Sequence, residues 1–166
     1  MARMIWAALL AAGVPSGAIA AEPASASPAS TPTLADEVKA LKTMDTAGKP
    51  AEALAQIDAI LARARKVRNI DRIDLIYAEA SRANALFWLD RYDEALGIYH
   101  RLEAELDSGK YPMTADRAEL VNNIGSLYSS LGKLEEATRY KLRALDLTAQ
   151  TAGTESIEYE IGRAHV

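Results

Sequence analysis

The chain has 166 residues, no cysteine, and a net charge of −4 from 19 Lys+Arg and 23 Asp+Glu. The acidic balance argues against nucleic acid or an anionic membrane as the main partner. The lack of cysteine excludes a disulfide framework and a thiol nucleophile, so the folded part must be stabilised by packing.

Residues 1–20 have the pattern of a secretory signal peptide. Arg3 precedes an apolar run from Ile5 to Val14, and Ala18–Ala20 fits a small-residue cleavage site. The apolar run is shorter than the roughly 20 residues that a transmembrane helix needs. We therefore expect an exported protein, periplasmic or secreted, with no stable membrane insertion after the signal is cleaved.

Residues 21–33 are rich in Ala, Ser and Pro and contain no large apolar side chain to bury. This composition predicts a disordered linker. The linker either holds the folded part away from the export machinery or is simply left over after cleavage.

Beyond Leu34 the apolar residues recur at helical spacing, and strand signals are absent. Turn and cap residues predict six helices, at residues 34–46, 50–67, 72–89, 92–106, 114–131 and 134–149. Gly48 is expected to end the first helix in a left-handed conformation. Asp90–Arg91 and Gly132–Lys133 are expected to turn the chain within the two later pairs. The predicted fold class is all-α, with three helix pairs.

One interval recurs along these helices. Ala53, Ala95 and Ala137 are 42 residues apart, and each follows a glutamate. A period in this range indicates a stacked array of helix pairs. The units are residues 34–75, 76–117 and 118–159. Because such arrays hold other molecules rather than transform them, the repeat predicts a binding function.

Small residues occupy the positions at which the two helices of a unit should touch. Ala83 and Gly125 stand at the eighth position of the second and third units, and Ala95 and Ala137 stand at the twentieth. Two antiparallel helices approach closely only where side chains are small, so we expect these residues at the contact within each pair.

These features resemble the tetratricopeptide repeat. The third unit carries the resemblance best, through Ile124-Gly125, Tyr128, Gly132 and Glu135-Glu136-Ala137. The 42-residue period, in place of the common period of about 34, is similar to the variant found in kinesin light chains and many bacterial arrays. The resemblance implies three helical hairpins over residues 34–160 in a right-handed superhelix. The first helices of the units would line a concave groove that binds a protein or peptide.

The resemblance also implies which side chains face the groove. In the second and third units they are mostly neutral hydrogen-bonding or aromatic residues: Tyr77, Ser81, Asn84, Phe87, Trp88, Asn122, Asn123, Ser126, Ser129 and Ser130. Asn side chains can hold the backbone of an extended peptide, and Phe87 or Trp88 can anchor an apolar side chain. Alternatively, the two aromatic residues pack between neighbouring units, and the asparagines cap helices or face solvent.

The sequence shows no nucleotide-binding, hydrolase or metalloprotease motif and no Cys/His ligand set. We therefore expect no enzyme activity, cofactor or metal in this chain, with His100 facing solvent. An alternative is that the array is the N-terminal recognition or regulatory part of a larger exported enzyme, for example a caspase-like protease.

Two expectations concern the C-terminal end. Residues 161–166 resemble read-through of a sequencing adapter, which predicts a non-native tail on a fragment. No polar cap is expected after the helix at 134–149, so this open end can stack on another copy of the chain.

Overall fold

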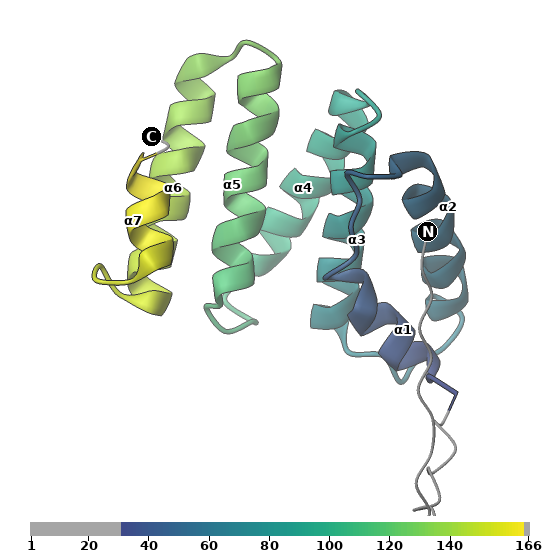
Figure 1. Cartoon of the computed structure of the whole chain (residues 1–166). Helices are drawn as coiled ribbons and strands as arrows, with labels where there is room; N and C mark the ends of the chain where they lie inside the picture. Colours follow the sequence, from purple (N-terminus) through teal and green to yellow (C-terminus); the bar gives the residue numbers. More distant parts are fainter. Residues whose placement is uncertain (1–30, 165–166) are drawn as a thin grey trace, which may run out of the picture. The chain divides into compact units, whose positions relative to one another are not determined.

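A computed structural model describes residues 31–164. The predicted signal peptide and residues 21–30 of the predicted linker lie outside the described residues, as do the last two residues of the predicted non-native tail. The described helices belong to a unit that begins at Pro32. In chain order they are α1 (Leu34–Leu41), α2 (Pro50–Ala64), α3 (Arg72–Phe87), α4 (Tyr92–Leu106), α5 (Ala115–Ser130), α6 (Leu134–Ala152) and α7 (Ile157–Ala164) (Figure 1).

The helices form successive antiparallel pairs, α1 with α2, α3 with α4, and α5 with α6 (Figure 1). The first helices of the pairs also contact one another, α1 with α3 and α3 with α5. The second helix of each pair contacts the first helix of the next. Between residues 31 and 164 there is no strand. The predicted all-α array of three helix pairs is confirmed.

Buried side chains run continuously through the array. Ile57, Ile76, Leu86 and Tyr99 are at most 1% exposed and belong to one cluster that extends from α1 to α5. A second cluster, of Ala118, Val121, Ala144 and Leu147, lies between α5 and α6. Each pair therefore buries its apolar faces partly against its neighbours, as expected for a stacked repeat.

Gly125 brings α5 close to α6. A Cβ atom at this position would lie 3.2 Å from the carbonyl oxygen of Ala137 and 3.0 Å from Cγ of Lys141. In the second unit, Ala83 and Ala95 are fully buried. The structure thus confirms small residues at the helix contact within these pairs.

The two later pairs turn in the same way. Asp90 and Gly132, 42 residues apart, have φ angles of 58° and 71°. After each of them the next N–H closes the preceding helix: Arg91 donates to the Leu86 carbonyl at 3.0 Å, and Lys133 donates to the Tyr128 carbonyl at 2.9 Å. These bonds define Schellman-type caps, which confirms the predicted turns.

The first pair departs from this pattern. Helix α1 ends at Leu41 instead of residue 46, and Gly48 is not among the residues with positive φ. The Asp45 side chain accepts hydrogen bonds from the N–H groups of Ala47 (2.9 Å) and Gly48 (3.2 Å), and such local bonds compete with helix formation. A Cβ at Gly48 would lie 2.9 Å from Oδ2 of Asp45, so glycine here leaves room for the Asp45 side chain and does not form a left-handed cap.

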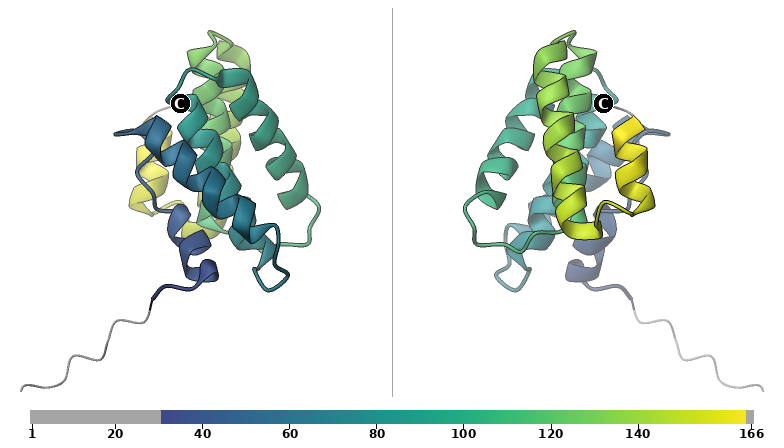
Figure 2. Two further views of the ribbon diagram at one scale, coloured as in Figure 1. Left: turned by 90° about the vertical axis from the view of Figure 1, so that its right-hand side faces the viewer. Right: turned by 90° about the vertical axis from the view of Figure 1, so that its left-hand side faces the viewer.

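The C-terminal end also differs from the prediction. Helix α6 continues to Ala152 and is followed by α7, which the sequence did not predict. Helix α7 lies beside α6 (Figure 2), and a Cβ at Gly162 would be 3.1 Å from Leu145. It begins 42 residues after α5, in phase with the repeat. The face of α6 expected to be open is therefore partly covered, although Leu134 and Leu142 remain 69% and 51% exposed.

Candidate functional site

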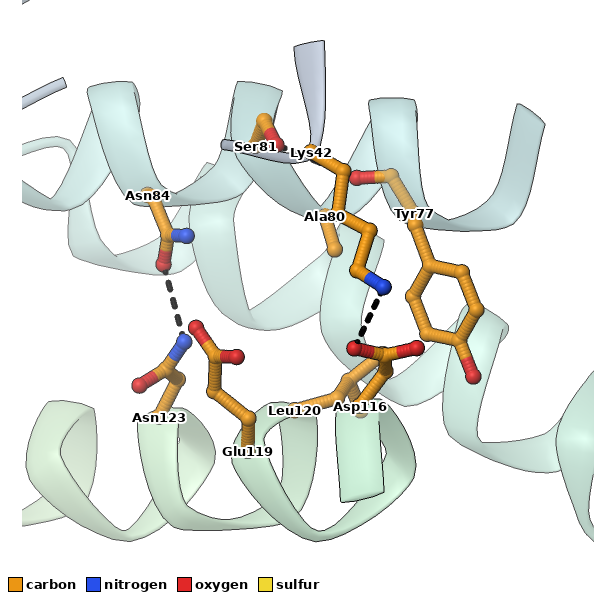
Figure 3. A pocket seen from close by; sticks show the side chains of 9 residues that line it. All are labelled: Lys42, Tyr77, Ala80, Ser81, Asn84, Asp116, Glu119, Leu120 and Asn123. Carbon is orange, nitrogen blue, oxygen red and sulfur yellow. Dashed lines mark hydrogen bonds and ion pairs between the residues drawn. The ribbon is translucent and has the colours of Figure 1, made fainter. Parts of the chain in front are cut away.

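A small pocket lies where α1, α3 and α5 meet (Figure 3). Its volume is about 30 Å³. Three helices supply its lining: Lys42 at the C-cap of α1, Tyr77, Ala80, Ser81 and Asn84 from α3, and Asp116, Glu119, Leu120 and Asn123 from α5. The pocket therefore lies on the face formed by the first helices of the three units.

Asn84 is held in place by two hydrogen bonds to its side-chain oxygen. Asn123 Nδ2 donates to Asn84 Oδ1 at 3.1 Å (Figure 3), and the Tyr99 hydroxyl donates to the same atom. Burial raises the pKa of Tyr99 above its usual value, so the hydroxyl stays protonated. Within residues 31–164, Asn84 Nδ2 and Asn123 Oδ1 have no hydrogen-bond partner. The pair thus presents one fixed donor and one fixed acceptor.

An ion pair crosses the pocket from the first unit to α5. Lys42 Nζ lies 2.7 Å from Asp116 Oδ1 (Figure 3), and it also lies 5.6 Å from the centre of the Tyr77 ring. The hydrogen bond to Asp116 raises the pKa of Lys42. Tyr77 is itself fixed by a 2.9 Å hydrogen bond to Thr114. The positive charge of Lys42 is therefore already neutralised by the protein.

Glu119 carries the remaining charge of the pocket. Its carboxylate lies between the Asn84–Asn123 pair and the Lys42–Asp116 pair (Figure 3). The side chain is exposed and, in the described part of the chain, makes no ion pair or hydrogen bond. With one lysine and two acids, the lining has a net negative charge. The sequence predicted a mostly neutral surface, and the other six residues of the lining are neutral.

Four of the residues selected from the sequence line the pocket: Tyr77, Ser81, Asn84 and Asn123. Asn122 is exposed and outside the pocket. Ser126, Ser129 and Ser130 each donate to the carbonyl four residues earlier in α5.

Phe87 and Trp88 also lie away from the pocket lining. Their rings meet edge to face at 5.1 Å. Phe87 packs partly buried against the core cluster, whereas Trp88 is 52% exposed. Packing therefore accounts for Phe87, and Trp88 stays available to solvent.

Sequence reasoning missed Asp116 and Glu119. Glu119 stands 42 residues after Tyr77, at the same repeat position, so the periodicity contained a signal for it. Asp116 lies in the first turn of α5, and its role depends on Lys42, which the early end of α1 brings to the pocket. No local pattern signals that pairing.

His100, which the sequence predicted to face solvent, has a side chain that is 38% exposed and also makes two polar contacts. Its Nε2 lies 3.0 Å from the Tyr128 hydroxyl and its Nδ1 lies 3.2 Å from a Glu103 oxygen. It therefore joins α4 to α5 and has a structural role between two units. Among residues 31–164, no group of three or more His, Cys, Asp or Glu is arranged to hold a metal ion.

Comparison with known proteins agrees with this architecture. Residues 117–158 match the family model described as tetratricopeptide repeat. A search of curated proteins gave no match. The chain therefore carries a tetratricopeptide repeat, and its helix pairs have the fold of an array of such repeats.

Two solved structures share the fold. One is BtubC (BKLC) from P. vanneervenii, with a TM-score of 0.61 and 22% identity over 69% of this chain and 45% of that chain. The other is a proposed kinesin light chain with nearly identical TPR-like repeats from Podosopora anserina, with a TM-score of 0.64 and 15% identity over 80% of this chain and 63% of that chain. This chain thus spans less than two thirds of the length of either solved structure. The resemblance to kinesin-light-chain-type repeats is confirmed at the level of the fold.

Within residues 31–164, none of the helices is both long and apolar enough to cross a membrane.

Proposed function

We propose that this chain is a protein-binding module that holds an extended peptide segment of its partner against the face formed by α1, α3 and α5. The observation that supports this most directly is the Asn84–Asn123 pair. Asn123 Nδ2 donates to Asn84 Oδ1, so Asn84 Nδ2 and Asn123 Oδ1 are left for a ligand. A donor and an acceptor held in fixed positions complement the C=O and N–H groups of a peptide backbone.

The second support is rigidity. Tyr99, from which Asn84 accepts a hydrogen bond, is 1% exposed and packed in the core. The Lys42–Asp116 pair joins two helices that flank α3. Preorganised groups lose little conformational entropy when a ligand binds. A surface built in this way suits reversible capture of a partner.

The binding test uses two neighbouring asparagines on α5. Asn123→Ala removes the pocket acceptor, while Asn84 keeps its bond from Tyr99, so no buried group loses its only partner. Asn122→Ala makes the same chemical change at an exposed position outside the pocket. Peptides are first selected on the immobilised chain from a random nine-residue display library. We expect Asn123→Ala to weaken their binding about 3- to 10-fold, as for one or two lost hydrogen bonds.

Asn122→Ala serves as the matched control and should bind with wild-type affinity. If the two variants bind alike, the peptide does not lie in this pocket and the proposed site is wrong. If no peptide is selected, the proposed function is wrong.

The protein is also proposed to act outside the cytoplasm, in the periplasm or in the medium. The pattern of residues 1–20 supports this proposal. N-terminal sequencing of the protein from a cell envelope fraction tests it. A mature N-terminus near Ala21 is expected, and an intact N-terminus on cytoplasmic protein would contradict export.

A further inference from the structure

We infer that the pocket selects a peptide segment with an arginine or lysine side chain, and that Glu119 receives this cation. The inference rests on the proposed function, because it names the chemistry of the peptide that the same pocket would hold. The partner it fits is a protein with an exposed, extended basic segment.

The first step is the charge balance of the pocket. Lys42 is engaged by Asp116 at 2.7 Å. Two other cations of α1 and α5 are engaged as well, since Lys39 lies 3.9 Å from Asp74 and Arg117 pairs with Asp107. Glu119 forms no ion pair among the described residues, and only a longer-range attraction links its charge to Lys42. A ligand cation can therefore satisfy Glu119 without breaking any existing contact.

An acidic ligand meets the opposite situation. A ligand carboxylate that bound Lys42 would have to share it with Asp116 and would lie close to two like charges, Asp116 and Glu119. Like charges at such distances disfavour one another. The hydrogen bond to Asp116 raises the pKa of Lys42 and so favours its charged form. The pocket therefore discriminates against acidic segments.

The position of Glu119 links the cation to the peptide backbone. Its carboxylate lies between the two asparagines and the ion pair (Figure 3). A peptide whose backbone bonds to Asn84 and Asn123 would place a neighbouring side chain within reach of Glu119. Arginine suits this carboxylate best, because a guanidinium group can donate two parallel hydrogen bonds to it.

The ligand side of the experiment compares selected peptides with close analogues. We expect peptides selected from the nine-residue library to be enriched in Arg or Lys. For one selected arginine peptide, affinity is then measured by fluorescence anisotropy against its citrulline analogue, which keeps the shape of the side chain and removes the charge. Because the ion pair would be accessible to solvent, we expect the citrulline analogue to bind about 2- to 5-fold more weakly than the arginine peptide. This difference in affinity should become smaller as salt is added.

Variants of the chain give effects of opposite sign. Glu119→Gln removes the carboxylate charge and should weaken binding of the arginine peptide about 2- to 5-fold. Lys42→Gln releases Asp116 as a second carboxylate and should strengthen binding by a similar factor. Glu155→Gln changes an exposed acid outside the pocket and should leave the affinity unchanged. Circular dichroism is used to check that each variant keeps the helicity of the wild type.

Each outcome separates this inference from the proposed function. Selected peptides that are acidic, with the two variant effects reversed in sign, would overturn the inference while peptide binding stands. Arginine peptides that are insensitive to Glu119→Gln would overturn it too. If Asn123→Ala is also without effect, the peptide lies elsewhere and the proposed site fails as well.

Discussion

Arg72 and Glu105 form a two-pronged ion pair between the start of α3 and the end of α4. Arg72 Nε donates to Glu105 Oε1 at 2.7 Å, and its terminal nitrogen donates to Oε2 at 2.5 Å. Tyr111 donates a third hydrogen bond to the same carboxylate, at 3.0 Å. One carboxylate thus fastens both helices of the second unit and the loop that leads to the third.

This contact makes stability depend on pH. The hydrogen bonds from Arg72 hold the pKa of Glu105 below its ordinary value of 4.5. Because the pKa is lower in the folded state, the stabilisation is present above pH 4.5 and is lost as the pH falls through the folded-state value. We expect Glu105→Gln to lower the free energy of unfolding at pH 7 by up to about 1 kcal/mol, since the pair is partly exposed.

Urea unfolding at pH 7 and pH 3 tests this expectation. The difference between wild type and Glu105→Gln should shrink at the lower pH. Asp146→Asn is the control, because Asp146 is exposed in the middle of α6 and makes no ion pair in the described part of the chain. A variant difference that is equal at both pH values would contradict a stabilising role of the charge.

The packing of α5 on α6 predicts opposite effects for two glycines. Gly125→Ala would place a Cβ 3.2 Å from the Ala137 carbonyl oxygen, whereas a Cβ at Gly97 in α4 meets nothing within 4 Å. Alanine favours a helix over glycine by about 1 kcal/mol, and overpacking costs about 1–3 kcal/mol. Gly97→Ala should therefore raise the free energy of unfolding. The Gly125→Ala variant should have a free energy of unfolding about 1–3 kcal/mol lower than that of the Gly97→Ala variant. Equal thermal midpoints would show that α5 and α6 are not in close contact.

The turn between α5 and α6 predicts a third effect. Gly132 has a φ of 71°, a conformation that costs a residue with a Cβ about 1–2 kcal/mol. Gly132→Ala should lower the unfolding free energy by that amount, while Gly132→Asn should lose less because asparagine tolerates this conformation better. Denaturant unfolding of both variants measures the difference. An unchanged midpoint for the alanine variant would contradict the Schellman-type cap.

Self-association remains a prediction, and it now rests on the part of α6 that α7 leaves exposed. Leu134 and Leu142 are 69% and 51% exposed, and burying such apolar side chains against a second copy would be favourable. We expect concentration-dependent dimers in sedimentation velocity, reduced in a Leu134→Gln/Leu142→Gln double variant. Val67→Gln, at an exposed apolar residue after α2, should have no effect. A monomer at all concentrations would contradict this prediction.

The fold was largely predictable because the residues that end its helices and form its turns act locally. Asp90 and Gly132 signal the same turn in successive units, and Ala95 and Gly125 signal helix contacts through their size alone. Gly48 misled the prediction because the Asp45 side chain, three residues earlier, forms its own turn. Hydrogen bonds to the Asp45 side chain form a turn where the helix was predicted to continue, and the repeat pattern does not show such bonds.

The candidate site was predictable only in part. The resemblance to tetratricopeptide repeats selected Tyr77, Asn84 and Asn123, because it implies which positions of a unit face the groove. It could not show that Asn84 accepts a hydrogen bond from Tyr99, or that Lys42 reaches Asp116 in the third unit. Those contacts join residues far apart in the chain, so they depend on how the units stack.

The most direct test of the account is a nitrogen–proton correlation spectrum of the full chain, recorded with and without a selected peptide. The side-chain amide resonances of Asn84 and Asn123 report on the pocket, and the indole N–H of Trp88 reports on the exposed aromatic residue outside it. We predict that the peptide shifts the two asparagine amides and leaves the Trp88 indole unchanged. A shifted indole with unchanged asparagine amides would contradict binding at the α1–α3–α5 face.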